Sequence, residues 1–102
     1  MLHQVEACHF QPLLGIVHPL LLSDGRVLEV RIDQIDLKPQ SQMPGSRMPF
    51  AVALSVAGQT DFVDGLCALE LPEIGMLDGL FVSRVPNMGR DAGTAYFQVA
   101  FN

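Results

Sequence analysis

The stretch Leu20–Ile32 reads LLLSDGRVLEVRI, two apolar runs joined by Asp24 and Gly25. Asp-Gly favours a type I′ turn, because both central residues of that turn need positive φ and these two residue types tolerate it. The sequence therefore predicts a β-hairpin with a two-residue turn, in which Leu22 lies opposite Val27.

This register decides which side chains share a face of the hairpin, because neighbouring residues of a strand point to opposite sides. The predicted core face holds Val17, Pro19, Leu21, Leu28, Val30 and Ile32. The predicted outer face holds Ile16, His18, Leu20, Leu22, Val27, Glu29 and Arg31. That outer face is more apolar than an ordinary solvent face. Pro19 donates no ladder hydrogen bond, which indicates that the first strand is an edge strand.

The second strand is predicted to bend. Its apolar alternation slips by one residue across Asp33 and Gln34, before Ile35 and Leu37. A slip of this kind is typical of a β-bulge, which bends a long strand so that it can serve two sides of a small barrel or sandwich. The segment 38–49 that follows has many helix and strand breakers and no periodicity, so we expect a mobile loop.

The later strands alternate more regularly. Phe50, Val52, Leu54 and Val56 form one face of a strand, and the opposite face is small: Ala51, Ala53, Ser55 and Ala57. Further strands are predicted over 62–71 and 77–85, and the last strand should turn Ala95, Phe97, Val99 and Phe101 inward.

With a short amphipathic helix predicted over about Leu2–Phe10, these strands indicate the fold class. We expect an all-β protein: a small, strongly bent, five- or six-stranded antiparallel barrel with a short N-terminal helix. At 102 residues, 49% of them hydrophobic, residues 1–102 should form a single domain with a real core.

Charge and composition disfavour several partners. The net charge is −5, and the six basic residues are scattered singly, so no basic patch is expected for nucleic acid. The N-terminus lacks the features of a signal peptide, and the apolar stretch Pro12–Leu22 is shorter than the roughly 20 residues that cross a bilayer. We therefore expect a cytoplasmic protein without membrane contact, in which Cys8 and Cys67 are free thiols rather than a disulfide.

The second half of the chain carries a pattern of apolar and glycine residues. It comprises Phe62, Gly65, Leu69-Glu70, Ile74-Gly75, Leu80-Phe81-Val82, Val85-Pro86 and Phe97-x-x-Ala100-Phe101-Asn102, with Phe10, Leu13 and Gly15 near the start. The pattern resembles a family of small uncharacterised bacterial proteins classed as a domain of unknown function. Cys67 departs from that pattern, because the family usually has an aromatic residue two positions after Gly65.

The resemblance implies a helix followed by strongly bent strands, which is similar to the Sm-like barrel. Sm-like proteins assemble as dimers or rings and often bind RNA. Their Arg-Gly pair between the fourth and fifth strands is absent here, where the chain reads Arg84-Val85-Pro86-Asn87. No Sm-like role is therefore carried over to any residue.

Residues that could carry catalysis or bind metal do not form a recognisable constellation. His3, His9, His18, Cys8 and Cys67 lack any metal-ligand spacing, so we expect no metal and no cofactor. The carboxylate pairs Asp33/Asp36 and Asp61/Asp64 are typical of turns and solvated faces. The segment Met88–Gly93 could cradle an anion, although a plain hairpin loop is the commoner use of such residues.

The sequence thus favours a non-enzymatic structural or interaction module that self-associates as a dimer or ring. The predicted interface comprises Leu20, Leu22, Val27, Ala51 and Ala53. The alternative is an Sm-like ligand- or RNA-binding module that uses loops 43–47 and 87–93, with Arg84, Asn87 and Arg90 as candidate binding residues. A small enzyme of unknown reaction comes third.

Overall fold

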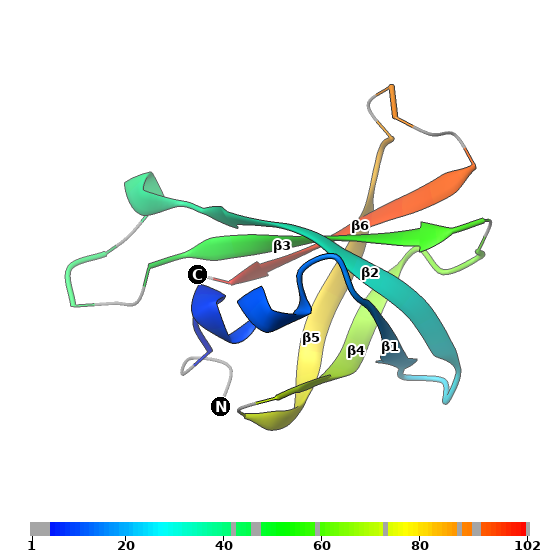
Figure 1. Ribbon diagram of the computed structural model, residues 1–102, viewed down its shortest axis with the longest axis horizontal. Helices are drawn as coiled ribbons and strands as arrows, with labels where there is room; N and C mark the ends of the chain where they lie inside the picture. Colours follow the sequence, from blue (N-terminus) through cyan, green and yellow to red (C-terminus); the bar gives the residue numbers. More distant parts are fainter. Residues whose placement is uncertain are drawn as a thin grey trace.

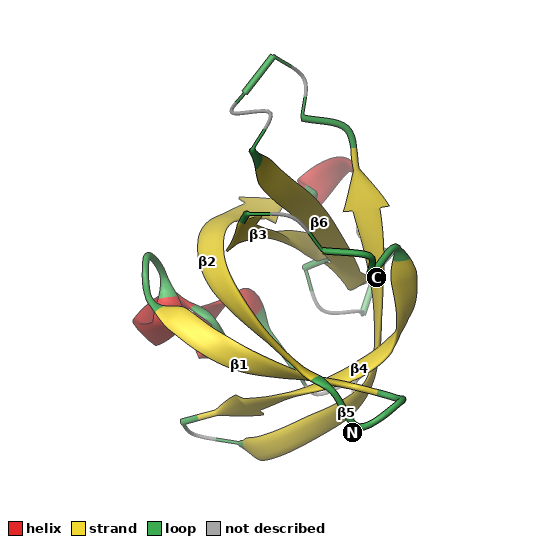
Figure 2. Cartoon of the chain, turned by 90° about the vertical axis from the view of Figure 1, so that its right-hand side faces the viewer, coloured by secondary structure: helices red, strands yellow, loops and turns green. Residues whose placement is uncertain are grey.

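The computed structural model describes residues 5–41, 43–45, 48–58, 60–72, 74–87, 89–90 and 93–101. Within these residues the strands are β1 (Val17–Leu22), β2 (Val27–Leu37), β3 (Phe50–Ala57), β4 (Asp64–Leu71), β5 (Gly75–Val85) and β6 (Thr94–Phe101). They form a closed antiparallel barrel in the order β1-β2-β3-β6-β5-β4, and Figures 1 and 2 show the bent strands that enclose it. The predicted fold class is confirmed.

A short N-terminal helix is also present. It consists of two 3₁₀ turns, η2 (Ala7–His9) and η3 (Gln11–Leu13), and another 3₁₀ turn, η4 (Pro39–Ser41), follows β2. Phe10 lies between η2 and η3 and packs on two strand residues, with ring centroids 6.0 Å from Phe50 and 5.5 Å from Phe101. These contacts hold the N-terminal turns against the barrel beside the end of β6 (Figure 1). Residues 2–4 of the predicted helix lie outside the described residues. No described helix is long and apolar enough to span a bilayer.

The loop of the first hairpin is one residue longer than predicted. The Leu22 N–H donates to the Arg26 carbonyl at 2.8 Å, and the Gly25 N–H donates to the Leu22 carbonyl at 3.0 Å. Gly25 adopts φ 93°, the left-handed conformation that closes a three-residue loop. Leu21 therefore lies opposite Val27, whereas the two-residue turn placed Leu22 there.

This change inverts the predicted faces of β1. Because the side-chain period of a strand is two, a shift of one residue exchanges the core and solvent faces. Leu20 is only 1% exposed and Leu22 is buried, whereas Val17 and Leu21, predicted to be core residues, are exposed. The prediction for β2 is correct. Val30 and Ile32 are fully buried, and Leu28 of the same strand packs against the core.

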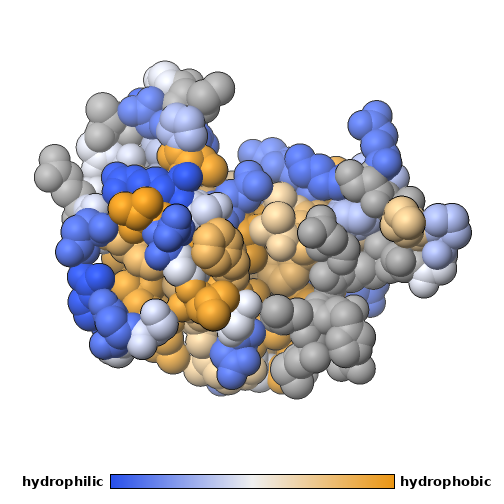
Figure 3. Space-filling model, turned by 180° about the vertical axis from the view of Figure 1, so that it is seen from behind, coloured by the Kyte–Doolittle hydropathy of each residue, from blue (hydrophilic) through white to orange (hydrophobic). Residues whose placement is uncertain are grey.

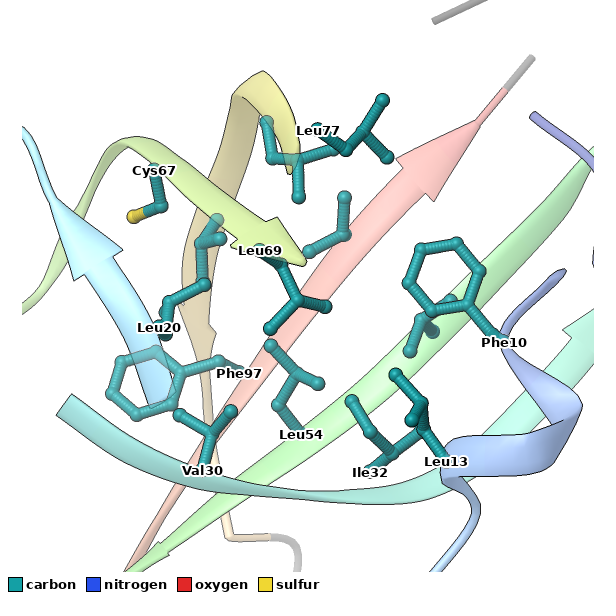
Figure 4. Close-up of a cluster of buried hydrophobic side chains, with 14 of the residues drawn as sticks. Phe10, Leu13, Leu20, Val30, Ile32, Leu54, Cys67, Leu69, Leu77 and Phe97 are labelled. Atoms are coloured by element: carbon teal, nitrogen blue, oxygen red, sulfur yellow. The ribbon is translucent and has the colours of Figure 1, made fainter. Parts of the chain in front are cut away.

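The remaining strands largely follow their predicted patterns. The pairing of β2 with β3 shifts between Ile32 and Gln34, which confirms the bulge. The predicted inward residues of β3 and β6 are all buried, and these two strands pair along their whole length, from Phe50–Phe101 to Ala57–Thr94. Figure 4 shows side chains from the 3₁₀ turns and from the strands converging in one core, with Leu20, Val30, Leu54, Cys67, Leu69 and Phe97 among them.

The barrel closes through a short seam between β1 and β4. These strands pair only at Leu21–Ala68 and Leu22–Cys67. Pro19 lies outside this paired stretch of β1, so its missing N–H costs no hydrogen bond in the seam. The prediction that β1 is a free edge strand is wrong, because β1 has a neighbour on each side.

Candidate functional site

Arg84, a candidate binding residue, is engaged inside the chain. Its Nη1 donates to the Thr60 carbonyl at 3.2 Å and to the Phe62 carbonyl at 3.4 Å. Its guanidinium also lies 5.8 Å from the centroid of the Phe97 ring. Arg84 therefore fastens the segment before β4 to β5, and its hydrogen-bonding capacity is partly used there.

The other two candidates, Asn87 and Arg90, form a local loop structure. The Arg90 Nε donates to the Asn87 carbonyl at 2.8 Å, and its Nη2 donates to the Pro86 carbonyl at 3.3 Å. The Asn87 Oδ1 accepts from the Gly89 N–H at 3.1 Å. The Arg90 guanidinium lies 3.8 Å from the centroid of the Tyr96 ring, a cation–π contact. Met88, Asp91 and Ala92 of this loop, and Ser46 and Arg47 of the other candidate loop, lie outside the described residues.

The acidic pairs serve local structure. Asp33 accepts from the Arg31 Nε at 2.6 Å, and Asp36 accepts from the Gln34 amide at 2.6 Å. Asp61 accepts from the Arg26 Nη1 at 2.9 Å, which ties the first hairpin to the segment before β4. Neither acidic pair is brought together as a catalytic dyad by these contacts.

Arg26 also binds Asp24 within the hairpin loop. The Asp24 carboxylate accepts from the Arg26 N–H at 2.9 Å and from its Nε at 2.7 Å. The backbone hydrogen bond is the largest cause that lowers the pKa of Asp24, and the guanidinium adds to it. The pKa of Arg26 is raised, first by its hydrogen bond to Asp61 and then by the bond to Asp24.

Soft metal ligands do not cluster within the described ranges, where no group of three His, Cys, Asp or Glu side chains is close enough to hold an ion. His3 lies outside those ranges. His18 lies opposite Val30 in the hairpin, and its Nδ1 is buried without a hydrogen-bond partner in that part of the chain.

Both cysteines are free thiols. Cys8 is exposed, whereas Cys67 is buried. Burial raises the pKa of the Cys67 thiol, because the thiolate would lose its hydration there. We therefore expect the exposed Cys8 thiol to be the more accessible of the two.

The predicted self-association surface is wrong for most of its residues. Leu20, Leu22 and Ala51 are buried, and Ala53 is only partly exposed. Leu20 and Leu22 turn inward because of the longer hairpin loop. Ala51 is a small residue between neighbouring strands. Val27 is exposed, as the sequence predicted.

A different apolar surface takes its place. It consists of Leu21 on β1, Val27 on β2, Leu66 on β4 and Phe81 on β5, and we name it the apolar face. Leu21 lies opposite both Val27 and Ala68, and Leu66 lies opposite Phe81, so these side chains are neighbours across four strands. Seen from behind, the molecule shows a broad area of hydrophobic surface bordered by hydrophilic residues (Figure 3).

A hollow of about 250 Å³ adjoins the apolar face. Its lining comprises Leu21, Leu22, Ser23, Leu66, Cys67, Ala68, Asp78 and Gly79. The hollow is therefore mostly apolar and lies directly over the β1–β4 seam. The alternation that turns Cys67 and Leu69 inward could have indicated that Leu66 points outward. Phe81 was hidden in a run that is apolar on both sides.

Comparison with known proteins yields one family. No curated protein and no solved structure matches the chain. Residues 5–101 match the model of a family described as Domain of unknown function (DUF6916). That match covers nearly the whole chain, which the structure shows as a small closed barrel of six strands. The chain therefore belongs to the DUF6916 family, a domain of unknown function.

Proposed function

We propose that this chain is a non-enzymatic interaction module that binds a second copy of itself through the apolar face. The observation that carries the proposal is the adjacency of Leu21, Val27, Leu66 and Phe81, four exposed large apolar side chains on one side of the barrel. Contiguous apolar patches on a protein surface commonly mark interaction sites.

The shape of the apolar face favours a second copy as the partner. The exposed Phe81 ring and the apolar hollow lie on the same side of one molecule. In a two-fold symmetric dimer the same patch meets itself, so Phe81 of each copy can contact the hollow region of the other. A projection and a hollow on one face are the elements that such self-complementary packing requires.

The expected affinity is modest. Full burial of one such side chain is worth about 1.5–3 kcal/mol, so eight side chains that are roughly half exposed contribute about 8 kcal/mol to a dimer. Association itself costs about 4–15 kcal/mol in lost freedom, which is of the same order. The dimer should therefore dissociate on dilution.

Salt provides a diagnostic. Each copy carries a net charge of −5, so two copies repel one another at low ionic strength. Added salt screens this repulsion and should strengthen an association that depends on apolar burial. Binding to a polyanion would respond in the opposite way.

The test is the solution mass by size-exclusion chromatography with light scattering, at two protein and two salt concentrations. We expect the fraction of dimer to rise with protein concentration and with salt concentration. The Phe81→Arg variant should remain a monomer. Leu37→Arg is the matched control, because Leu37 is equally exposed but lies at the opposite end of β2 from Val27. A wild-type monomer at high concentration, or an equal effect of both variants, would contradict the proposal.

The Sm-like, RNA-binding alternative has less support. Arg84 and Arg90 donate to backbone carbonyls of their own chain, and the net charge opposes a polyanion. A small enzyme is a third candidate, and the hydrogen bonds of Asp33, Asp36 and Asp61 to neighbouring side chains weigh against those carboxylates as its catalytic groups.

A further inference from the structure

A row of polar side chains crosses the outer surface of β2, β3 and β6, which run side by side in Figure 1. Arg31 lies opposite Ser55, and Ser55 lies opposite Tyr96. Because serine is small and its two neighbours are large, the Ser55 side chain is recessed between those of Arg31 and Tyr96. The row lies away from the seam between β1 and β4, on other strands of the ring.

Ser55 is an unusual residue for an outer strand face. It is only 4% exposed and is the one buried polar residue among those that the structure describes. No hydrogen bond to its hydroxyl is found within the same residues. The Ser55 Oγ is nevertheless not a fully enclosed atom without a partner, a description that among the described residues fits His18 Nδ1, so the hydroxyl is open to water or to a ligand in the hollow that it lines.

Ser55 also lines a groove of about 450 Å³. Its lining comprises Val17, Glu29, Arg31, Ser55, Val56, Ala57 and Thr94. This volume falls within the range of about 300–1,000 Å³ that small-molecule sites occupy. A second hollow, lined by Gly15, Arg31, Asp33, Arg90 and Tyr96, adjoins it, and Arg31 borders both.

Arg31 is anchored by one side-chain contact and is otherwise exposed. Its Nε donates to Asp33 at 2.6 Å, a contact that fixes the guanidinium at the bulge of β2. The terminal Nη atoms have no partner in the part of the chain that the structure describes. A guanidinium held at one nitrogen presents its remaining N–H groups in a fixed geometry that suits a carboxylate.

Tyr96 lies opposite Ser55 on β6 and lines the second hollow. The Arg90 guanidinium stacks on its ring at 3.8 Å, and Arg90 is itself held by the Pro86 and Asn87 carbonyls. This stacking restrains the ring and adds a second positive charge near the row. Two of the residues that line the second hollow are therefore held by contacts within the chain.

We propose that this groove binds a small molecule that carries a carboxylate. The carboxylate accepts hydrogen bonds from the Arg31 Nη atoms and the Ser55 hydroxyl, and a short apolar tail contacts Val17 and Ala57. Glu29 and Asp33 beside Arg31 disfavour a dianion such as phosphate, because each adds like-charge repulsion. The inference does not rest on self-association, which uses the apolar face.

The test uses NMR titration of the ¹⁵N-labelled chain with butyrate, inorganic phosphate and butanol as probes. We expect butyrate to shift the amides of Arg31, Ser55, Ala57 and Thr94 in a saturable way. Phosphate and butanol should bind at least tenfold more weakly, because one meets the acidic side chains and the other lacks the carboxylate. The groove amides serve as the readout, so loss of dimerisation does not affect the outcome.

Variants separate the two hydrogen-bonding groups. Arg31→Gln should weaken butyrate binding at least tenfold and Ser55→Ala several-fold, whereas Lys38→Gln, which removes the same charge from an exposed site, should leave it unchanged. If Arg31→Gln fails to fold, Arg31→Lys, which keeps the charge and loses the planar fork, should weaken binding several-fold. The proposal would be overturned if butyrate bound the Arg31 variants as tightly as wild type, or if phosphate or butanol bound as tightly as butyrate. It would also be overturned if butyrate left the groove amides unshifted.

Discussion

Leu66 and Phe81 lie opposite each other on β4 and β5, and each is 56% exposed, while the next pair, Cys67 and Leu80, is buried. Neighbouring positions of one strand should therefore differ in their effect on stability. We expect Phe81→Ser to change the free energy of unfolding by no more than about 0.5 kcal/mol. Leu80→Ala should cost about 2–5 kcal/mol, because it leaves a cavity. Urea unfolding of dilute protein, where association is negligible, measures both, and a large loss for Phe81→Ser would contradict the exposed position of the ring.

The hairpin register can be tested in the same way. Leu20 is buried and Leu21 faces outward, so Leu20→Ala should reduce the free energy of unfolding by about 2–5 kcal/mol and Leu21→Ala by less than about 1 kcal/mol. A two-residue turn would exchange these effects. Thermal and urea denaturation of the two variants distinguish the registers, and equal losses would support neither.

Asp24 should make the stability of the hairpin depend on acid. Its folded pKa lies below the ordinary value of 3.8, chiefly because its carboxylate accepts from the Arg26 N–H. The ionised carboxylate therefore stabilises the fold above that pH, and the stabilisation is lost as the pH falls through the lower folded pKa. We expect wild type to melt above Asp24→Asn at neutral pH and the difference to vanish in strong acid. Asp64→Asn is the control for removal of an exposed charge, and a pH-independent difference for Asp24→Asn would exclude this linkage.

The two thiols should react at very different rates. Cys8 is exposed, whereas Cys67 is buried and has a raised pKa, so little thiolate is present and little of it is accessible. An alkylating reagent should modify one cysteine in the native protein and the second only in denaturant. Mass spectrometry of peptides from Cys8→Ser and wild type assigns the sites. Fast native modification at Cys67 would indicate that β4 opens readily beside the seam.

The success of the sequence-based predictions depended on contrast between the faces of a strand. In β3 and β6 large apolar residues alternate with small or polar ones, so the inward positions of Phe50, Leu54 and Phe97 could be predicted. In β1 both faces are apolar, and the length of the hairpin loop alone decides between them. Asp-Gly fits a two-residue and a three-residue loop, because Gly25 can take positive φ in either.

The candidate sites were harder to predict because they depend on pairing between distant strands. Arg31, Ser55 and Tyr96 form a row only through the register of three strands, and the bulge after Ile32 stands next to that row. The single local indication was a serine within a strand face made otherwise of alanine. The apolar face likewise joins β1 to β4, a closure that no local pattern specifies.

That closure has a consequence for local opening of the barrel. Leu21–Ala68 and Leu22–Cys67 are far apart in sequence and form only a short ladder, so the chain gains little there for the entropy lost in closing a long loop. We expect the amides of this seam to exchange with solvent faster than those of the long β3–β6 ladder. Since the apolar face spans the seam, a second copy bound there would hold both edges together. Assembly would then slow hydrogen exchange in β1 and β4 of each protomer, so that the closed ring and the dimer stabilise each other.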